Sequence, residues 1–324
     1  MIKNFFEWYQ KQIQETKIDP LFVWNEFGKD FEYGHFEKIK HIAGQTFFFK
    51  HPNSKLFKIY GGYYKKRNKS HVVLADNQLA ANSELIAKKK YKRFGFMTAD
   101  YQVAMHDEEF YLFSPQLFFA DEVELATLYQ IYCDTSQSSV FQASAKELGR
   151  GNLTNFLIRK KVMLNMMTEN CYDQLAKYFL MSIFEFSDDE HFNNIILCKN
   201  KNSKKFESVF VFDKESTVFD YSIAKGKSFQ ETRDYATRFN TYMGLPVAWN
   251  IENFNERMKA LSELIKSGVL EKKYCDFLNE LAQFNFCEAC KEIYEETGAK
   301  SNQTQIDMFR FGSEKAGELS ILGK

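Results

Sequence analysis

The stretch from residue 184 to residue 213 constrains the fold of this 324-residue chain most. It begins with the apolar residues Phe184–Phe186, which read as the end of a helix, and continues through a short charged loop into the apolar strand Ile195–Leu197. Residues 199–207 are mostly Lys, Asn, Ser and Glu, a composition typical of a hairpin turn. A second apolar strand, Val209–Phe212, follows. The pattern predicts a two-stranded ribbon that is reached from a helix through a polar loop.

Three polar residues stand towards one end of this predicted ribbon: Asp189 in the loop, Asn194 just before the first strand, and Asp213 after the second. Phosphoryl transfer needs an aligned acceptor hydroxyl and a hard cation held by oxygen ligands. In kinases an Asp orients the hydroxyl, and an Asn five residues later and an Asp after the next strand hold Mg²⁺. The spacing therefore predicts Asp189 as catalytic and Asn194 and Asp213 as metal ligands. Ordinary turn chemistry is the alternative, because Asp and Asn side chains also bond their own backbone.

The loop resembles the catalytic loop of the HipA-like serine/threonine kinases, a group that includes HipA toxins and CtkA-type bacterial kinases. Their loop reads Asp-x-His-x-x-Asn, and here it reads Asp189-Glu190-His191-Phe192-Asn193-Asn194. Their metal-binding Asp precedes a Ser-containing turn, as Asp213 does before Ser216. The resemblance implies a two-lobed, protein-kinase-like α+β fold, with a β-rich N-terminal lobe and a mainly helical C-terminal lobe. It also places His191 in the catalytic site, where it supports the loop.

The same resemblance implies what the chain acts on and with what. ATP and Mg²⁺ would be the cofactors, and the acceptor would be a Ser or Thr of a protein substrate, with the chain itself included. An antitoxin-like protein would be a partner, as in a toxin–antitoxin pair. One departure from the family pattern is Glu190, where the family often has Arg, and Asp188 adds a second carboxylate beside Asp189. Both leave the metal and substrate preference open.

A nucleotide-binding Lys is expected before the catalytic loop. Lys50 ends the aromatic strand Thr46–Lys50 and resembles the family's Lys that bridges the ATP phosphates to an acidic residue on the next helix. Lys58 is the other candidate. No Gly-rich phosphate loop precedes Lys50, because Gly28 and the two glycines that follow it, Gly34 and Gly44, are too dispersed.

Glu84 is the expected partner of that Lys. A helix is predicted over Asn77–Phe94, with Gly95 as its C-terminal cap, and Glu84 lies on its apolar face. An unpaired carboxylate there is costly, so a cation is expected beside it. The alternative is that Glu84 lies at the edge of this face and reaches solvent. The basic run Lys88–Arg93 reads as a solvated helix end, not as a nucleic-acid site.

We place the lobe boundary near Ser114–Phe119, with residues 1–117 as the N-terminal lobe and 118–324 as the C-terminal lobe, which holds the catalytic loop at 187–197. The remaining predictions are a hairpin of the strands Tyr101–Met105 and Glu109–Phe113, helices at Leu125–Cys133, within Leu153–Phe186, at Glu252–Lys266 and at Leu270–Glu296, an irregular and substrate-facing Ser216–Asn250, and one short helix near Ile306–Phe311.

Composition narrows the class of protein. Lys and Arg together number 43, as do Asp and Glu, so the net charge gives no reason to expect nucleic acid, and no helix-turn-helix is visible. No apolar run is long enough to span a membrane, and the first residues do not form a signal peptide. We expect a bacterial cytoplasmic protein, with export as an effector by another signal left open.

The six cysteines are scattered and are predicted to be reduced thiols. Cys287 and Cys290 form a lone C-x-x-C, without the second pair that a zinc site needs. We predict that both are packed core cysteines and that the chain holds no zinc.

Two other functions stay open. The chain could be a pseudokinase or ATP-binding interaction module, which the missing Gly-rich loop favours. It could also be a kinase that acts on a small molecule or a lipid head group.

Overall fold

The structure is a computed structural model, and the residues that it describes are 48–50, 55–58, 74–98, 102–106, 109–113, 116–117, 123–127, 160–187, 190–191, 195–200, 202–211, 226–238, 240–244 and 251–323. In the strands of residues 48–58, 102–127, 190–191 and 240–252 it describes the backbone alone.

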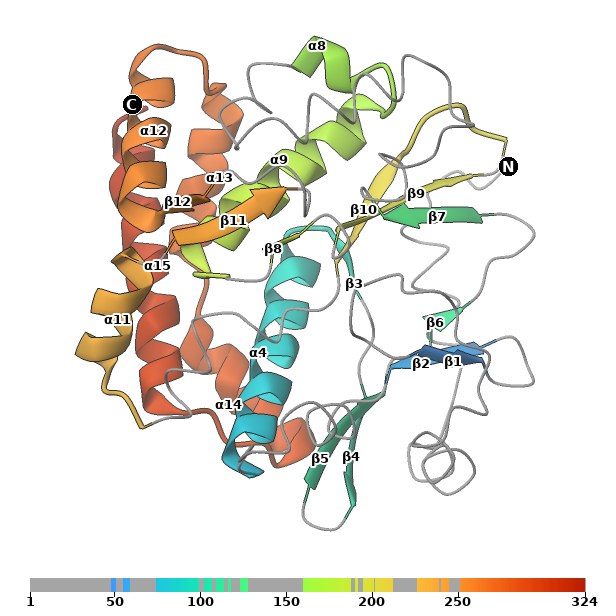
Figure 1. The fold of residues 1–324 in the computed structure, drawn as a ribbon, viewed down its shortest axis with the longest axis vertical. Helices are drawn as coiled ribbons and strands as arrows, with labels where there is room; N and C mark the ends of the chain where they lie inside the picture. The colour runs from blue at the N-terminus through green and yellow to red at the C-terminus, as the bar shows by residue number, and fades with distance from the viewer. Residues whose placement is uncertain are drawn as a thin grey trace.

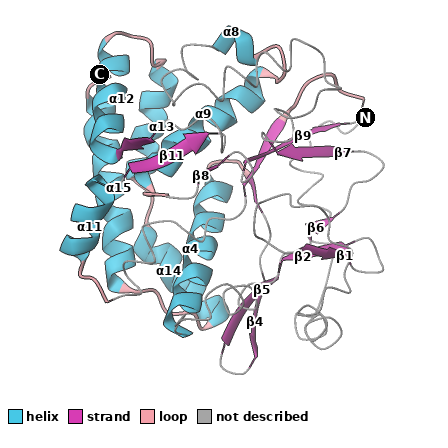
Figure 2. Cartoon of the chain, in the orientation of Figure 1, coloured by secondary structure: helices cyan, strands magenta, loops and turns pink. Residues whose placement is uncertain are grey.

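Helices dominate the described C-terminal part of the chain, and most strands lie before it (Figure 2). The helices are α4 (Leu74–Arg93), α8 (Lys160–Met163), α9 (Glu169–Phe184), α11 (Phe229–Arg238), α12 (Phe254–Lys266), α13 (Lys272–Ala282), α14 (Phe286–Thr297) and α15 (Gln303–Ile321). The strands are β1 (Phe48–Lys50), β2 (Lys55–Lys58), β3 (Met97–Thr98), β4 (Gln102–His106), β5 (Glu109–Phe113), β6 (Gln116–Leu117), β7 (Val123–Thr127), β8 (Glu190–His191), β9 (Ile195–Asn200), β10 (Ser208–Val211), β11 (Asn240–Gly244) and β12 (Ile251–Asn253).

The long C-terminal helix α15 packs against five of the other described helices. It contacts α9, α11, α12, α13 and α14, and Figure 1 shows α11, α12 and α13 beside it on the left of the view. Helix α4 comes from the N-terminal part of the sequence but packs against α14. Helix α9, which precedes the predicted catalytic loop, therefore packs against the C-terminal helix of the chain.

Helix α9 is the buried scaffold that leads to this segment. Thr168 begins it as an N-cap, because its side-chain oxygen accepts a hydrogen bond of 3.2 Å from the backbone N–H of Cys171. From Tyr178 to Phe184 every side chain is at most 3% exposed. A helical segment that is buried on all sides lies inside the molecule, so the C-terminal half of α9 is part of the core. This agrees with the predicted role of α9 as the support of a polar loop.

The predicted ribbon is the centre of a four-stranded sheet. Strands β9 and β10 are antiparallel, β7 pairs with the other edge of β9, and β3 pairs in parallel with β10. Residues 195–198 and 208–211 are buried, and continuous apolar strands of this kind are covered on both faces. The sheet therefore contains one strand, β3, from before the expected lobe boundary and three strands from after it. The position of the boundary itself stays a prediction.

Three smaller sheets complete the described strands. The hairpin β4–β5 is antiparallel, as predicted for residues 101–113. Strand β2 pairs with β1 and β6, and strand β11 pairs antiparallel with β12 and in parallel with β8. The described elements thus combine helices and strands, as an α+β fold requires, and the two-lobed arrangement remains a prediction.

Four predictions of secondary structure were wrong. Residues 123–127 form strand β7, where a helix was expected from Leu125. The single helix predicted over Leu270–Glu296 is two helices, α13 and α14. The stretch Ser216–Asn250 contains helix α11 and strand β11. The tail holds a helix of 19 residues, α15, and not a short one.

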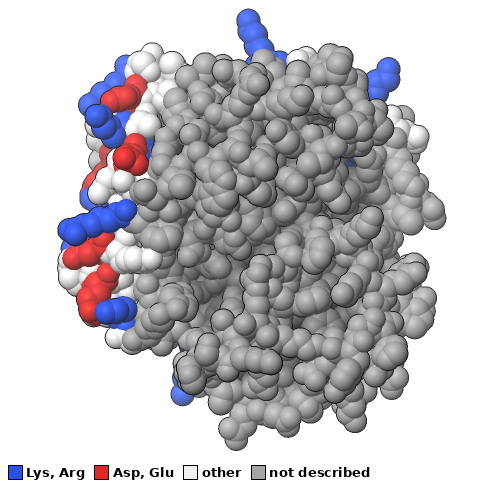
Figure 3. Space-filling view, in the orientation of Figure 1, with Lys and Arg blue, Asp and Glu red and all other residues white. Residues whose placement is uncertain are grey.

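Positive and negative side chains alternate on the described surface. On the face drawn in Figure 3, blue and red groups follow each other along the left edge of the molecule. This pattern agrees with the equal numbers of acidic and basic residues in the sequence. Among the described helices none is both long and apolar enough to cross a membrane.

Candidate functional site

The three predicted catalytic and metal-binding residues, Asp189, Asn194 and Asp213, lie outside the described residues. The strands next to Asn194 and Asp213 in the sequence, β9 and β10, are described. Val211 at the end of β10 is paired with Ile195 at the start of β9. Asn194 directly precedes Ile195 in the sequence, and Asp213 comes two residues after Val211. Paired Cα atoms in an antiparallel ladder are about 4.5–5.5 Å apart. The segments that carry the two predicted metal ligands therefore join the ribbon at the same end.

His191 lies in a strand where a plain loop was expected. Its backbone belongs to β8, which pairs in parallel with β11, so that His191 stands opposite Gly244 and Glu190 stands opposite Met243. The partner strand comes from the stretch predicted to be irregular. Within the predicted catalytic loop, the backbone is thus paired at these two residues. The side chain of His191 is not described, and its supporting role stays a prediction.

The chain enters the loop segment through a sharp turn at Glu185–Ser187, which we refer to as the Phe186 turn. The Ser187 N–H bonds to the carbonyl oxygen of Ser182 at 3.2 Å, and the Phe186 N–H bonds to that of Ile183 at 3.2 Å. This is the Schellman pattern, in which one residue adopts the left-handed conformation. Helix α4 ends in the same pattern with Gly95 at that position (φ 78°), whereas α9 places Phe186 there (φ 52°).

A phenylalanine in this conformation costs about 1–2 kcal/mol relative to the right-handed one, so packing has to hold it. The Phe186 ring is 3% exposed and lies 4.7 Å from the ring of Phe254 and 5.7 Å from the ring of Phe311, centroid to centroid. The neighbouring Gly312 of α15 leaves room for the turn, because a Cβ there would collide with the Phe184 carbonyl oxygen. Helices α12 and α15 therefore hold the turn from one side.

A buried ion pair holds the Phe186 turn from the side of α4. The Nζ atom of Lys90 lies 2.9 Å from Oε1 of Glu185, and the Tyr91 hydroxyl donates to Oε2 of the same carboxylate at 2.9 Å. The two charged side chains are 2% and 0% exposed. The ring of Phe286 also lies 5.4 Å from the Lys90 Nζ. A charge buried this deeply needs such partners, because an unpaired one would be costly.

This pair corrects one prediction and was missed by the sequence reading. Lys90 was assigned to a solvated basic helix end, yet it points into the core. Its neighbour Lys89 behaves as predicted for a surface residue, bonding to Glu292 at 2.8 Å and Glu296 at 2.9 Å. The available signal was that Lys90 is three residues from the buried Ala87 on the same helix face.

Glu84 is buried on α4, with 2% of its side chain exposed. The alternative that it reaches solvent is therefore wrong. Lys50, its predicted partner, lies in β1 opposite Leu56 of β2, and Lys58 lies opposite Phe48. Since the side chains of these strands are not described, the Lys50–Glu84 pair and the choice between Lys50 and Lys58 stay predictions.

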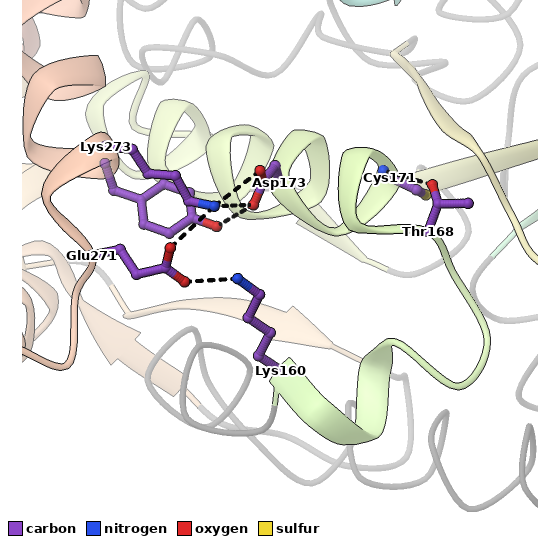
Figure 4. Close-up of polar contacts among 7 residues, drawn as sticks. Lys160, Thr168, Cys171, Asp173, Glu271 and Lys273 are labelled. Carbon is purple, nitrogen blue, oxygen red and sulfur yellow. Dashed lines mark hydrogen bonds and ion pairs between the residues drawn. The ribbon is translucent and has the colours of Figure 1, made fainter.

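A second polar network anchors the N-terminal half of α9, far from the Phe186 turn (Figure 4). Asp173 accepts hydrogen bonds from Lys273 at 2.8 and 3.0 Å and from the Tyr274 hydroxyl at 2.8 Å. Glu271 pairs with Lys273 at 3.1 Å and with Lys160 at 2.9 Å. These contacts tie α8 and the start of α13 to α9. Each charged side chain in the network has a partner of opposite charge, which indicates a structural role.

The network shifts the titration of its members. The hydrogen bond from Lys160 lowers the pKa of Glu271 most, and Lys273 lowers it further. Burial raises the pKa of Tyr274, and the hydrogen bond to Asp173 raises it again. Both groups therefore keep their charge states, ionised Glu271 and neutral Tyr274, over the neutral range.

The described residues contain no cluster of three or more His, Cys, Asp or Glu side chains that could hold a metal ion. Five cysteines within them are free. Burial raises the pKa of Cys171 and of Cys198. Cys290 is buried as predicted, but Cys287 is exposed and is not a core residue.

No family model and no curated protein matches this chain. Among solved structures, it is similar to the Helicobacter pylori proinflammatory kinase CtkA, with a TM-score of 0.47 and 11% identity over 90% of this chain and 95% of that one. It is also similar to HipA of the Shewanella oneidensis MR-1 toxin–antitoxin system, solved with HipB and operator DNA, with a TM-score of 0.47 and 10% identity over 97% of this chain and 70% of that one. Both come from the group that the motif at residues 189–194 resembles, and at these identities no residue role transfers from them to this chain.

Proposed function

We propose that this chain is a HipA-like kinase that transfers the γ-phosphate of ATP, with Mg²⁺, to a Ser or Thr hydroxyl of a protein substrate, the chain itself included. The observation that carries the proposal is the pairing of Ile195 with Val211. It supports a common position for Asn194 and Asp213, which a shared metal ion requires.

The proposed roles follow from the chemistry of each group. Asp189 would orient the acceptor hydroxyl and accept its proton. Asn194 and Asp213 would hold Mg²⁺ through their amide and carboxylate oxygens, and the metal would neutralise charge on the phosphates. Lys50, paired with Glu84, would position those phosphates. Since phosphoryl transfer depends on positioning and on electrostatic stabilisation, a rigid support for the loop matters for its rate.

The Phe186 turn supports this reading independently of the motif. Strained backbone persists only where the surroundings hold it, and such positions cluster at functional sites. Here the strain at Phe186 stands directly before the loop that carries Asp189, and a buried ion pair and an aromatic cluster hold it. A rigid start is what a preorganised catalytic loop needs.

Other parts of the proposal rest on the motif resemblance alone. These are the two-lobed arrangement, an antitoxin-like partner and a bacterial cytoplasmic location. The second candidate function is a pseudokinase, favoured by the absence of a Gly-rich segment before Lys50. A kinase for small molecules or lipid head groups is the third.

The test is transfer of labelled γ-phosphate from ATP in the presence of Mg²⁺, with the chain alone, with a bacterial lysate and with an extracted metabolite and lipid pool. We expect label on protein from the wild type and none from Asp189→Asn. Asp276→Asn, on the exposed side of α13, is the matched control and should transfer like the wild type.

Each alternative has its own outcome in this assay. Label in the metabolite or lipid pool only would favour the small-molecule kinase. Binding of Mg²⁺-ATP in calorimetry without any transfer would favour the pseudokinase.

A further inference from the structure

Cys287 and Cys290 stand at the start of helix α14 in contrasting surroundings. Cys287 is the second residue of the helix and is exposed, whereas Cys290 is 7% exposed. The preceding residue, Asn285, caps the helix by accepting a hydrogen bond of 3.1 Å from the Glu288 N–H. The C-x-x-C therefore combines one accessible thiol with one sheltered thiol in the first two turns of a helix.

The spacing allows these two thiols to be joined. Side chains three residues apart on a helix have Cβ atoms about 5–6 Å apart, and a disulfide needs about 3.5–4.5 Å. Closing it requires an approach of about 1–2 Å. The first four N–H groups of a helix have no intrahelical partner, and that of Cys287 is among them. The first turn can therefore tighten around Cys287 without breaking a helical hydrogen bond of that residue.

One positively charged side chain contacts the exposed sulfur. The guanidinium of Arg310, on α15, donates a hydrogen bond to the Cys287 sulfur. The helix start adds a partial positive charge at the same place. Two carboxylates oppose these effects: Asp307, 3.5 Å from the other guanidinium nitrogen of Arg310, and Glu288, which the Asn285 amide contacts at 3.3 Å. The accessible sulfur of Cys287 is therefore in direct contact with a cationic hydrogen-bond donor.

The sheltered thiol of Cys290 is harder to ionise than a free thiol. Burial raises the pKa of Cys290, and the neighbouring Cys287 raises it further, while Ser301 and Arg310 act against this. Cys290 therefore keeps its proton at neutral pH. This division suits a pair in which the exposed sulfur attacks first and the buried one resolves the product.

We propose that Cys287 and Cys290 form a redox-active dithiol that reacts with low-molecular-weight disulfides. The Cys287 thiolate attacks one sulfur of a disulfide such as oxidised glutathione, forming a mixed disulfide and releasing one glutathione thiolate. The Cys290 thiol then attacks the Cys287 sulfur, and its proton and the second glutathione leave together as a thiol. The two protein thiols are oxidised, and one disulfide is reduced to two thiols.

The test uses the reduced full-length chain, oxidised glutathione at neutral pH, and mass spectrometry of the peptides after alkylation. In the wild type we expect the peptide with both cysteines to lose two hydrogen atoms, and dithiothreitol to reverse the change. Cys290→Ser should stop at a glutathione adduct on Cys287, and Cys287→Ser should give neither product. The buried Cys275 of α13 serves as the internal control and should stay unmodified.

Two charge variants test the role of Arg310. Arg310→Gln should slow alkylation of Cys287 about threefold, because the guanidinium group that contacts the sulfur is lost. Asp307→Asn should speed the alkylation of Cys287, because the Arg310 guanidinium then no longer pairs with a carboxylate as well as with the sulfur. Circular dichroism checks that both variants fold. The proposal is overturned if the wild type yields only the adduct without the intramolecular disulfide, or if both charge variants react at the wild-type rate.

Discussion

The ammonium group of Lys90 lies 2.9 Å from the carboxylate of Glu185, and this pair joins helix α4 to the last turn before the predicted catalytic loop. Lys90→Met leaves the buried Glu185 carboxylate without its ammonium partner, although the Tyr91 hydroxyl still donates to it. We expect a loss of about 3–5 kcal/mol in the free energy of unfolding, measured by denaturant titration.

The matched control is the adjacent lysine. Lys89→Met removes two ion pairs whose carboxylates are 48% and 61% exposed, and exposed pairs contribute at most about 1 kcal/mol. Equal losses in the two variants would contradict the assigned importance of the buried pair.

Gly312 is required where α15 crosses the end of α9. In an ordinary helix interior, Gly→Ala stabilises by about 1 kcal/mol. At Gly312 the added methyl group would strike the Phe184 carbonyl oxygen, so we expect a net loss of about 1–3 kcal/mol. Gly317→Ala in the same helix meets only the Ala282 Cβ at 3.2 Å and should be close to neutral. Thermal unfolding of both variants measures the difference, and a stabilised Gly312→Ala would be the contrary result.

Phe186 combines an unfavourable backbone with favourable packing, and two substitutions separate these effects. Phe186→Ala should cost about 3–5 kcal/mol through lost ring contacts. Phe186→Gly loses the same contacts but relieves the left-handed backbone, so it should be more stable than Phe186→Ala by about 1 kcal/mol. Denaturant titration of the two variants decides, and a less stable glycine variant would show that φ at this position is not strained.

Glu271 should make a small contribution to stability that depends on pH. Hydrogen bonding by Lys160 lowers its pKa in the folded chain below the ordinary 4.5. The unfolded chain therefore binds a proton first as the pH falls, so the stabilisation is complete well above pH 4.5 and is lost as the pH falls through the folded value.

Glu271→Gln removes this contribution. Because the carboxylate is 45% exposed, the effect after solvent screening is about 0.5 kcal/mol. The wild type should lose that much more stability than the variant between about pH 6 and about pH 3. If the wild type and Glu271→Gln differed in unfolding free energy by the same amount at both pH values, the lowered pKa of Glu271 would be ruled out.

Local signals predicted the elements that are governed by local physics. The helix that contains Glu84 ends at Arg93, with Gly95 in the left-handed position, as its sequence indicated. The β9–β10 ribbon follows from two apolar runs around a polar turn. In both cases the hydrophobic pattern and the turn residues act within a few positions of each other.

Elements that depend on distant partners were not predictable in this way. Residues 123–127 form a strand because they pair with β9, and such pairing overrides a weak helical pattern. The break before α14 had a local signal, the N-cap Asn285, that the helical periodicity concealed. Helix α15 contains two glycines, and its length is explained by packing against five other helices.

In the candidate site, too, the features set by nearby residues were predictable and those set by distant contacts were not. The spacing of Asp189, Asn194 and Asp213 is visible in the sequence, and the ribbon register supports the position of the last two. The inward orientation of Lys90 could not be read from a run of basic residues. It depends on Glu185, which is 95 positions away in the chain.

The most direct measurement of the central claim is the Mg²⁺-dependent transfer of labelled γ-phosphate by the wild type and by Asp213→Asn, with Asp276→Asn as the control. If Asp213 holds the metal, the wild type and the control transfer label to protein, and Asp213→Asn loses the transfer at every Mg²⁺ concentration or requires much more metal. Transfer by Asp213→Asn at the wild-type rate and with the wild-type Mg²⁺ dependence would contradict the account.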